Sequence, residues 1–92
     1  MTKEIVKMNC GERYEMALIP ERVHEFVNRY GKSEYQIHFK DEAGNKCFTI
    51  TSSWRIAKKV MSNMHNALEA SFLVVAPNMD FNAYRIKELK FV

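Results

Sequence analysis

Hydrophobic residues between Ser52 and Ala70 recur at the spacing of an amphipathic helix. The apolar stripe consists of Trp54, Ala57, Val60, Met61, Met64 and Leu68. Ser52 or Ser53 is suited to the N-cap, because a serine hydroxyl accepts a hydrogen bond from an unpaired N–H of the first helical turn. The sequence therefore predicts a long helix whose apolar stripe is buried against the rest of the protein.

A shorter helix is predicted between Pro20 and Gly31. Proline is tolerated at the first helical position, where its missing N–H would have no partner, and glycine commonly ends a helix. The apolar residues of this segment follow the helical period as well, at Val23, Phe26, Val27 and Tyr30.

The hydrophobic period changes to two between Glu34 and Thr51, which favours a β-hairpin with its turn at residues 42–45. On the first strand the buried face consists of Tyr35, Ile37 and Phe39, and the other face consists of Gln36, His38 and Lys40. On the return strand Phe48 and Ile50 are the apolar positions. The open face is then left to Cys47, Thr49 and Thr51.

Further strands are predicted on either side of these elements. Residues 3–19 favour two short strands around a turn at residues 9–12, with an inward face made by Val6, Met8, Tyr14, Met16 and Leu18. Residues 71–76, SFLVVA, are apolar on both faces and predict a central strand. In the last strand, residues 81–92, the apolar positions change parity after Ile86, so we expect a β-bulge near Lys87 or Glu88, or a frayed end.

The predicted order is β-β-α-β-β-α-β-β, which contains the βαββαβ pattern of a ferredoxin-like domain with one extra strand at each end. The sequence thus predicts an α+β fold in which two helices pack on one face of an antiparallel sheet. A chain of 92 residues has the size of one domain, so residues 1–92 are expected to form a single unit.

The composition is that of a globular protein, with 47% hydrophobic and 27% charged residues. No apolar run is long enough to span a bilayer, and the first residues lack the apolar block of a secretory signal, so we expect no membrane association and a cytoplasmic location. Two cysteines, Cys10 and Cys47, are too few for a disulfide framework, and both are expected to be free thiols.

The sequence favours neither a metal site nor catalysis. His24, His38, His65 and the two cysteines contain no pair at the spacing of metal ligands. The nearest pairs of carboxylates are Asp41 with Glu42 and Glu12 with Glu15. Both pairs fall in predicted turns or at strand ends, where carboxylates are ordinarily solvated. We therefore expect a protein without cofactors that is not an enzyme.

The most distinctive polar feature is the cationic start of the long helix, because cations there add to helical N–H groups that already favour anions. Cations at the end of the hairpin could extend this patch, and cations and an aromatic residue on the last strand could add to it. The candidate binding residues for a protein partner or for phosphate are Arg55, Lys58, Lys59, Lys40, Lys46, Tyr84, Arg85 and Lys87. Solvated lysines that only keep the protein soluble are the simpler interpretation of the same pattern.

The middle of the chain also resembles the RNA recognition motif in the order of FVNRYG, YQIHF and KCFTIT, followed by Ala57 and Val60 in the next helix. The resemblance implies that Phe48 and Ile50 stack on bases from the open face of a sheet. The alternation of the hairpin assigns both residues to the core instead, and the glycines of the family's K-G-F-G-F-V motif are absent. We therefore do not assign the chain to that family.

Two functional hypotheses follow. The first is a small non-catalytic interaction or regulatory protein, such as an inhibitor or adaptor, that binds a protein partner or forms a homodimer, because SFLVVA needs cover on both faces. The second is a nucleic-acid-binding module that uses the basic start of the long helix and the C-terminal strand.

Overall fold

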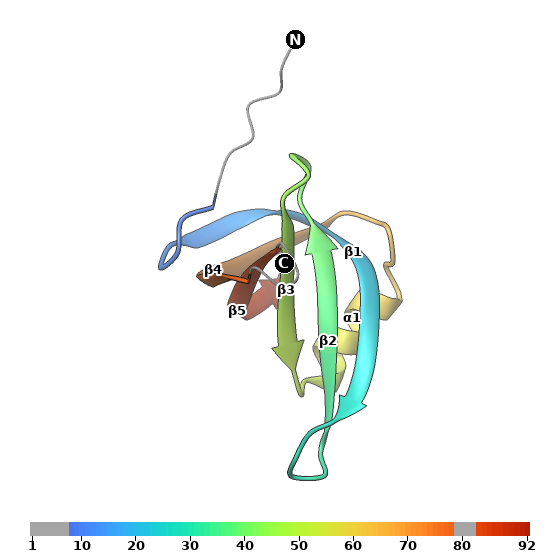
Figure 1. Cartoon of the computed structure of the whole chain (residues 1–92). Coiled ribbons are helices and arrows are strands. Elements are labelled where there is room, and N and C mark those ends of the chain that lie inside the picture. The colour runs from blue at the N-terminus through green and yellow to red at the C-terminus, as the bar shows by residue number, and fades with distance from the viewer. Residues whose placement is uncertain (1–7, 79–82) are drawn as a thin grey trace.

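The computed structural model describes residues 8–78 and 83–92, which form five strands and one helix (Figure 1). The elements are β1 (Arg13–Val27), β2 (Ser33–Lys40), β3 (Lys46–Thr51), α1 (Trp54–Met61), β4 (Leu68–Asn78) and β5 (Ala83–Phe91). The strands close into a barrel in the order β1-β2-β3-β5-β4, in which β3 and β5 are parallel and the other described pairs are antiparallel.

The predicted α+β ferredoxin-like fold with two helices is therefore wrong, because the described chain contains one helix and its sheet closes on itself. Closure gives each strand one face toward a common interior, which is filled by side chains from all five strands. The largest fully buried side chains of this interior include Phe39, Phe72, Leu18, Ile37 and Ile86.

The predicted helix over residues 20–31 is wrong, because this segment is the second half of β1. Val23 pairs with Ile37 of β2 and packs against the core, while Val27 is 68% exposed near the end of the strand. A β-bulge lies between Pro20 and Arg22. Proline is compatible with a bulge, since a bulge interrupts the hydrogen-bond ladder to which proline cannot donate.

The hairpin of β2 and β3 is confirmed, and Tyr35, Ile37 and Phe39 face the core as predicted. Its turn is held by Asp41, whose side-chain oxygens accept hydrogen bonds from the backbone N–H and the side-chain amide of Asn45 at 2.8 and 2.9 Å. The predicted phase of β3 is wrong. The pairing of Phe39 with Cys47 turns the small residues into the barrel. Phe48 and Ile50 consequently lie on the outer face, where Phe48 is still buried, as predicted, while Ile50 is 38% exposed.

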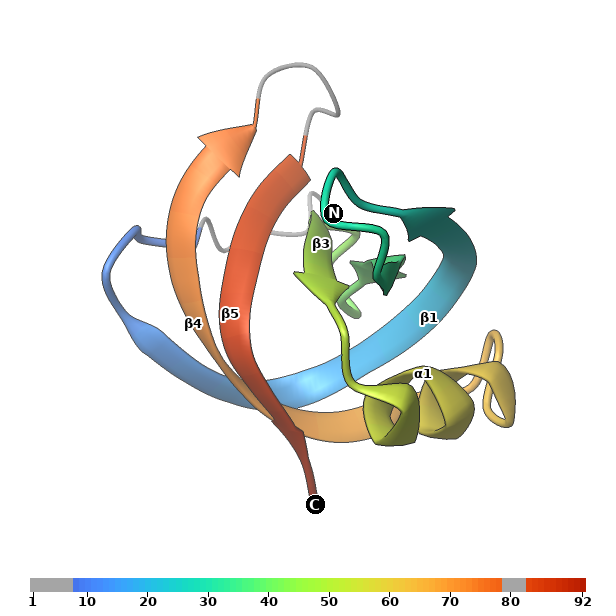
Figure 2. The same ribbon diagram turned by 90° about the horizontal axis from the view of Figure 1, so that it is seen from below.

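The helix predicted over residues 52–70 is shorter than expected and ends at Met61. Ser53 is confirmed as an N-cap, since its hydroxyl accepts from the N–H of Ile56 at 3.3 Å, and Ala57 and Val60 are buried as expected. Trp54, which was expected in the core, is 56% exposed. The view along the barrel shows α1 lying outside the strands, on the same side as β1 (Figure 2).

The C-terminal elements agree with the strand predictions. In β4, Phe72 and Val74 are fully buried inside the barrel. In β5, the predicted bulge is confirmed, because Glu88 has a φ of 52° and the pairing with β4 shifts register between Ser71 and Leu73. The predicted strand before Met8 lies outside the described residues. No helix in the described part of the chain has the length and apolar character required to cross a membrane.

Candidate functional site

A row of aromatic and cationic side chains crosses four strands on the outer face of the barrel. Arg22 of β1 lies opposite His38 of β2, His38 lies opposite Phe48 of β3, and Phe48 lies opposite Arg85 of β5. Directly opposed residues have neighbouring side chains on the same face of a sheet. The row therefore reads cation, aromatic, aromatic, cation across the barrel. The next pair on this face toward the hairpin turn, Lys40 and Lys46, adds two more cations.

The two rings at the centre of the row are stacked. The centroids of His38 and Phe48 are 5.9 Å apart and their planes differ by 23°. Phe48 is only 2% exposed, whereas His38 is half-buried, so the imidazole ring presents the more accessible surface. Burial lowers the pKa of His38, and the positive charges of Arg22 and Lys46 lower it further, against the opposing effect of Glu21. His38 is consequently an uncharged planar ring at neutral pH.

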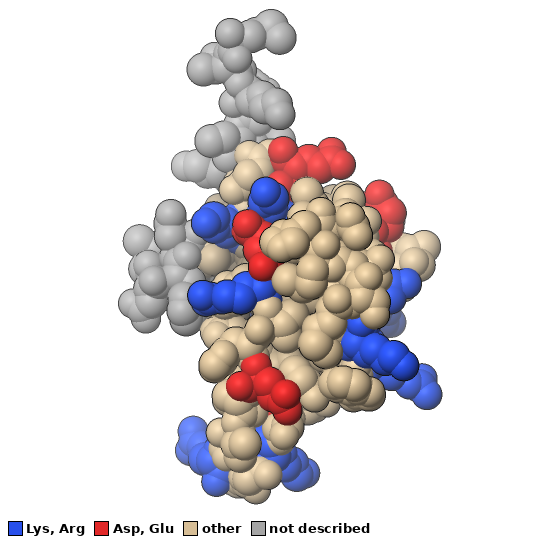
Figure 3. All heavy atoms as spheres, turned by 90° about the vertical axis from the view of Figure 1, so that its right-hand side faces the viewer, with Lys and Arg blue, Asp and Glu red and all other residues tan. Residues whose placement is uncertain are grey.

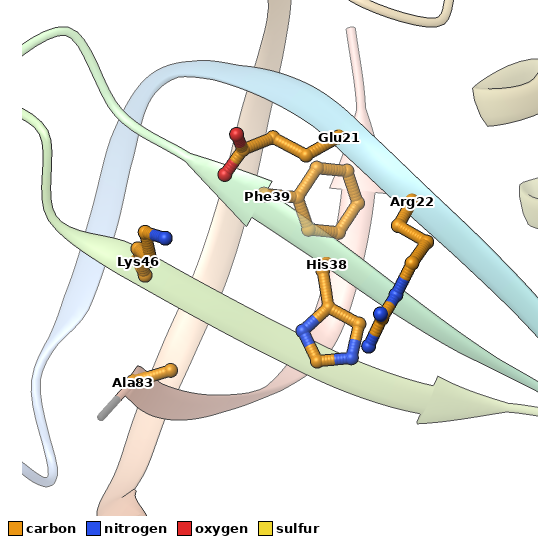
Figure 4. A pocket seen from close by; sticks show the side chains of 6 residues that line it. All are labelled: Glu21, Arg22, His38, Phe39, Lys46 and Ala83. Carbon is orange, nitrogen blue, oxygen red and sulfur yellow. The ribbon is translucent and has the colours of Figure 1, made fainter. Parts of the chain in front are cut away.

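A pocket of about 380 Å³ opens beside this row. It is lined by Glu21, Arg22, His38, Phe39, Lys46 and Ala83. Figure 4 shows these side chains approaching the pocket from β1, β2, β3 and the first residue of β5. Glu21 is the extra residue of the β1 bulge, since Pro20 pairs with Phe39 and Arg22 with His38. The bulge thus places the carboxylate of Glu21 and the guanidinium of Arg22 next to each other at the same pocket.

The outer face continues along β1 toward the tip of the hairpin. The rings of His24 and Phe26 stack at 6.3 Å with an interplanar angle of 14°. His24 lies opposite Gln36, and Phe26 lies opposite Glu34, on the outer side of β2. Arg22, His24 and Phe26 therefore occupy every second position of β1, and they present one cation and two rings on the same face.

The loop between β1 and β2 carries an exposed aromatic residue between cations. Asn28 organises the loop, because its side-chain oxygen accepts from the N–H groups of Tyr30 and Lys32 at 2.9 and 3.1 Å. Gly31 completes the turn with a φ of 79°, a conformation that glycine adopts without strain. Tyr30 is 79% exposed, and the guanidinium of Arg29 lies 5.9 Å from the centre of its ring. Figure 3 shows cationic side chains at this lower end of the molecule.

The structure brings together only some of the candidate residues predicted from the sequence. Lys40 and Lys46 face each other beside the row, and Arg85 belongs to the row itself. Lys87 is exposed further along β5. Tyr84 is partly buried against the core, on the opposite face of β5 from Arg85, so it is not part of this surface.

The predicted helix cations form a separate group. Arg55, Lys58 and Lys59 lie on α1, which follows the far end of β3 from Lys46. A strand rises about 3.3 Å per residue, so Lys46 and Thr51 are separated by about 17 Å along β3. Lys58 and Lys59 lie in the last turn of the short helix, where they complement the helix dipole. The continuous patch predicted from the sequence is therefore divided between the two ends of β3.

Several residues of the outer face were missed by the sequence prediction: Glu21, Arg22, His24, Phe26, Arg29, Tyr30 and Lys32. All of them fall in the segment that was predicted as a helix or at its end. One sequence pattern did point to this face. The alternation of residues in β2 correctly separated His38 and Lys40 from the buried residues. Recognising their neighbours required the pairing of β1 with β2.

Acidic side chains gather on another part of the barrel. A second pocket is lined by Glu15, Asp41, Glu42 and Glu69 together with Met16, Ala17 and Ala43. Asp41 is buried and hydrogen-bonded within its turn, so its carboxylate is structural. The described residues contain no group of three or more histidines, cysteines or acids that could hold a metal ion.

The thiol of Cys47 is not a candidate nucleophile. It is fully buried in the barrel, and burial, with smaller contributions from Asp41 and Glu21, raises its pKa to about 12. A thiol with such a pKa is protonated at neutral pH, and the thiolate is the reactive species.

A scan against protein-family models gave no match, and searches of curated proteins and of solved structures gave no significant match. The fold is therefore described from the topology alone. Five strands close into a barrel in the order β1-β2-β3-β5-β4, with a helix between β3 and β4.

Proposed function

We propose that the protein binds single-stranded nucleic acid on the outer face of β1, β2 and β3. The observation that carries this proposal is the row of Arg22, His38, Phe48 and Arg85, which combines flat rings with flanking cations. The topology of this barrel resembles that of the oligonucleotide/oligosaccharide-binding (OB) fold. OB folds bind oligonucleotides on the face of strands 2 and 3 and at the loop between strands 1 and 2. That fold-level analogy is supporting evidence only, because folds host unrelated functions.

The chemistry of the row matches the two recurring parts of a single-stranded nucleic acid. Cations neutralise phosphates and release their counterions, and aromatic rings stack on bases of any sequence. Here Arg22 lies beside the His38 ring, and Arg85 lies beyond Phe48 at the other end of the row. An uncharged imidazole supported by a buried phenyl ring provides a rigid stacking surface between them.

The hairpin of β1 and β2 extends the surface into a track. From His38 to Lys32 the track covers about 20 Å at the rise of a β-strand. It passes the stacked pair of His24 and Phe26 and ends at exposed Tyr30 with its neighbouring cations. A track of this length suits several nucleotides, within the range of site sizes typical of one OB barrel.

Chemical-shift mapping tests the proposal directly. We would titrate the ¹⁵N-labelled protein with a mixed-sequence single-stranded DNA ten-mer and expect a dissociation constant of about 10⁻⁶ to 10⁻⁴ M. The expected shifts lie in β2, in β3 and in β1 after its bulge. Shifts confined to α1 would move the site to the helix, and the absence of any shift would refute the function.

Matched variants give the second part of the test. Arg22→Ala combined with Arg85→Ala should weaken binding, because these are the cations at the two ends of the row. Lys90→Ala is the control, since Lys90 is an exposed cation of β5 that pairs with Ser71 away from the row. Equal affinity of the double variant and the control would contradict a role for the row.

Binding of a protein partner is the second candidate, and an exposed apolar group on α1 favours it. Trp54 is 56% exposed and Met61 is 42% exposed. Aromatic residues and methionine are enriched at the centres of protein interfaces. A homodimer remains within this proposal, and analytical ultracentrifugation of the purified protein tests it.

We also propose that the protein acts in a reducing, cytoplasmic compartment. Cys10 is an exposed free thiol and Cys47 is a buried one. Free thiols persist in compartments in which glutathione and thioredoxin keep cysteine reduced. Localisation of a tagged protein in its native cell tests this proposal.

A further inference from the structure

We propose that Glu21 reads bases in the pocket beside the row and selects bases that carry an exocyclic amino group, such as cytosine, over thymine and uracil. This inference rests on the proposed binding of single-stranded nucleic acid. Glu21 would add a preference for certain bases. A surface of cations and rings alone would not produce such a preference, because phosphate contact and stacking are largely independent of sequence.

The bulge gives Glu21 its position. Without an extra residue, the alternation of β1 would continue directly from inward-facing Pro20 to outward-facing Arg22. The insertion places Glu21 at the mouth of the pocket, half-buried, beside Arg22 and across from Lys46 (Figure 4). Bulges recur beside binding sites because they redirect a side chain in this way.

The carboxylate of Glu21 is available to a ligand. Among the described residues it forms no hydrogen bond or ion pair, although Arg22 and Lys46 line the same pocket. A carboxylate in a surface that binds only phosphates would weaken the binding by repulsion. Its presence beside Arg22 and Lys46 in this pocket is explained if it accepts a hydrogen bond from the ligand.

The donor and acceptor pattern of the pocket distinguishes the two pyrimidines of DNA. An ionised carboxylate is only an acceptor, whereas Arg22 and Lys46 are only donors. Cytosine offers an amino group to Glu21 and carbonyl and ring-nitrogen acceptors to the cations. Thymine has a carbonyl oxygen in place of the amino group and would set it against the carboxylate. The pocket volume of about 380 Å³ is within the range of small-ligand sites.

The test compares binding of fluorescently labelled dC10 and dT10 by anisotropy. The wild-type protein should prefer dC10 by about tenfold, as expected for one hydrogen bond to a charged group. Glu21→Gln should abolish the preference, because an amide can present either a donor or an acceptor. Glu21→Ala should abolish it as well, and circular dichroism confirms that each variant folds.

Glu25→Gln is the matched control, because it removes the same charge from an exposed residue of β1 outside the pocket. It should keep the preference of the wild-type protein. If Glu21 only neutralised its cationic neighbours, Glu21→Gln would change the affinity for both oligonucleotides by the same factor. That result, or equal binding of dC10 and dT10 by the wild type, would overturn the inference. Failure of both oligonucleotides to bind the wild type would instead refute the proposed function itself.

Discussion

The salt dependence of binding should identify which cations contact phosphates. For single-stranded nucleic acid, the logarithm of the binding constant falls with the logarithm of the salt concentration by about 0.7 for each neutralised phosphate. Arg22, Lys40, Lys46 and Arg85 lie on or beside the row. If each neutralises one phosphate, the slope for the wild-type protein is about −3.

Removing the two arginines should reduce the size of this slope by about 1.4. The assay is fluorescence anisotropy of a labelled single-stranded DNA at a series of salt concentrations between about 50 and 300 mM, the range over which phosphate contacts change affinity most visibly. The variants are Arg22→Ala with Arg85→Ala, and Lys90→Ala as the control. Lys90→Ala should retain the slope of the wild type.

The same assay separates the barrel face from the helix. Lys58→Ala with Lys59→Ala removes two cations from α1 and should leave the slope unchanged if the strand face carries the phosphate contacts. A slope that is lowered by the helix variant and unchanged by the arginine variant would refute the reasoning, and it would assign phosphate binding to α1.

Three further predictions concern the core, the titration of the central ring and the surface of the helix. Phe72→Ala should lower the free energy of unfolding by about 3 to 5 kcal/mol, because Phe72 is fully buried. Trp54→Ala should lower it by about 2 kcal/mol or less, because Trp54 is 56% exposed. Urea denaturation measures both losses, and equal losses would contradict the barrel core. The pKa of His38 is lowered in the folded protein, so as the pH falls below the ordinary value of 6.5 the unfolded chain takes up a proton that the folded protein does not. The free energy of unfolding should therefore decrease between pH 6.5 and the lower pKa of His38, and His38→Gln should reduce this decrease. His24→Gln removes an exposed imidazole from the same face and controls for the loss of a histidine. Trp54 is the single tryptophan of the chain, and its fluorescence should change little on addition of single-stranded DNA if binding is confined to the strand face; strong quenching would show that α1 takes part.

The elements that were predicted correctly are those whose local pattern agrees with their tertiary environment. The alternation of Tyr35, Ile37 and Phe39 identified both the strand and its buried face. The change of parity after Ile86 predicted the bulge at Glu88. In both cases the buried residues are large and apolar, so hydrophobicity alone marks the inward direction.

The phase of β3 could not be predicted in this way, because on this strand the larger apolar residues are not the ones that face the barrel interior. Cys47 and Thr49 face inward, while the larger Phe48 and Ile50 face outward. The interior of a small barrel combines small and large side chains, and here Phe39 and Phe72 already fill it. A smaller residue on β3 then fits the space that remains. The sequence alone does not reveal how much of the interior the other strands occupy.

The bulge at Glu21 explains why β1 was not recognised as one strand and why the residues of its outer face were missed. Before the bulge the inward residues are at even positions, such as Leu18 and Pro20, and after it the inward residue is Val23. A period-two pattern that changes phase in the middle looks like two unrelated segments, and the second half then fitted a helical period. The row itself joins residues from four strands, so no local motif contains it. One inserted residue both hides the strand in the sequence and places Glu21 beside Arg22 at the pocket, so the irregularity in hydrophobic alternation and the composition of the pocket lining have the same cause.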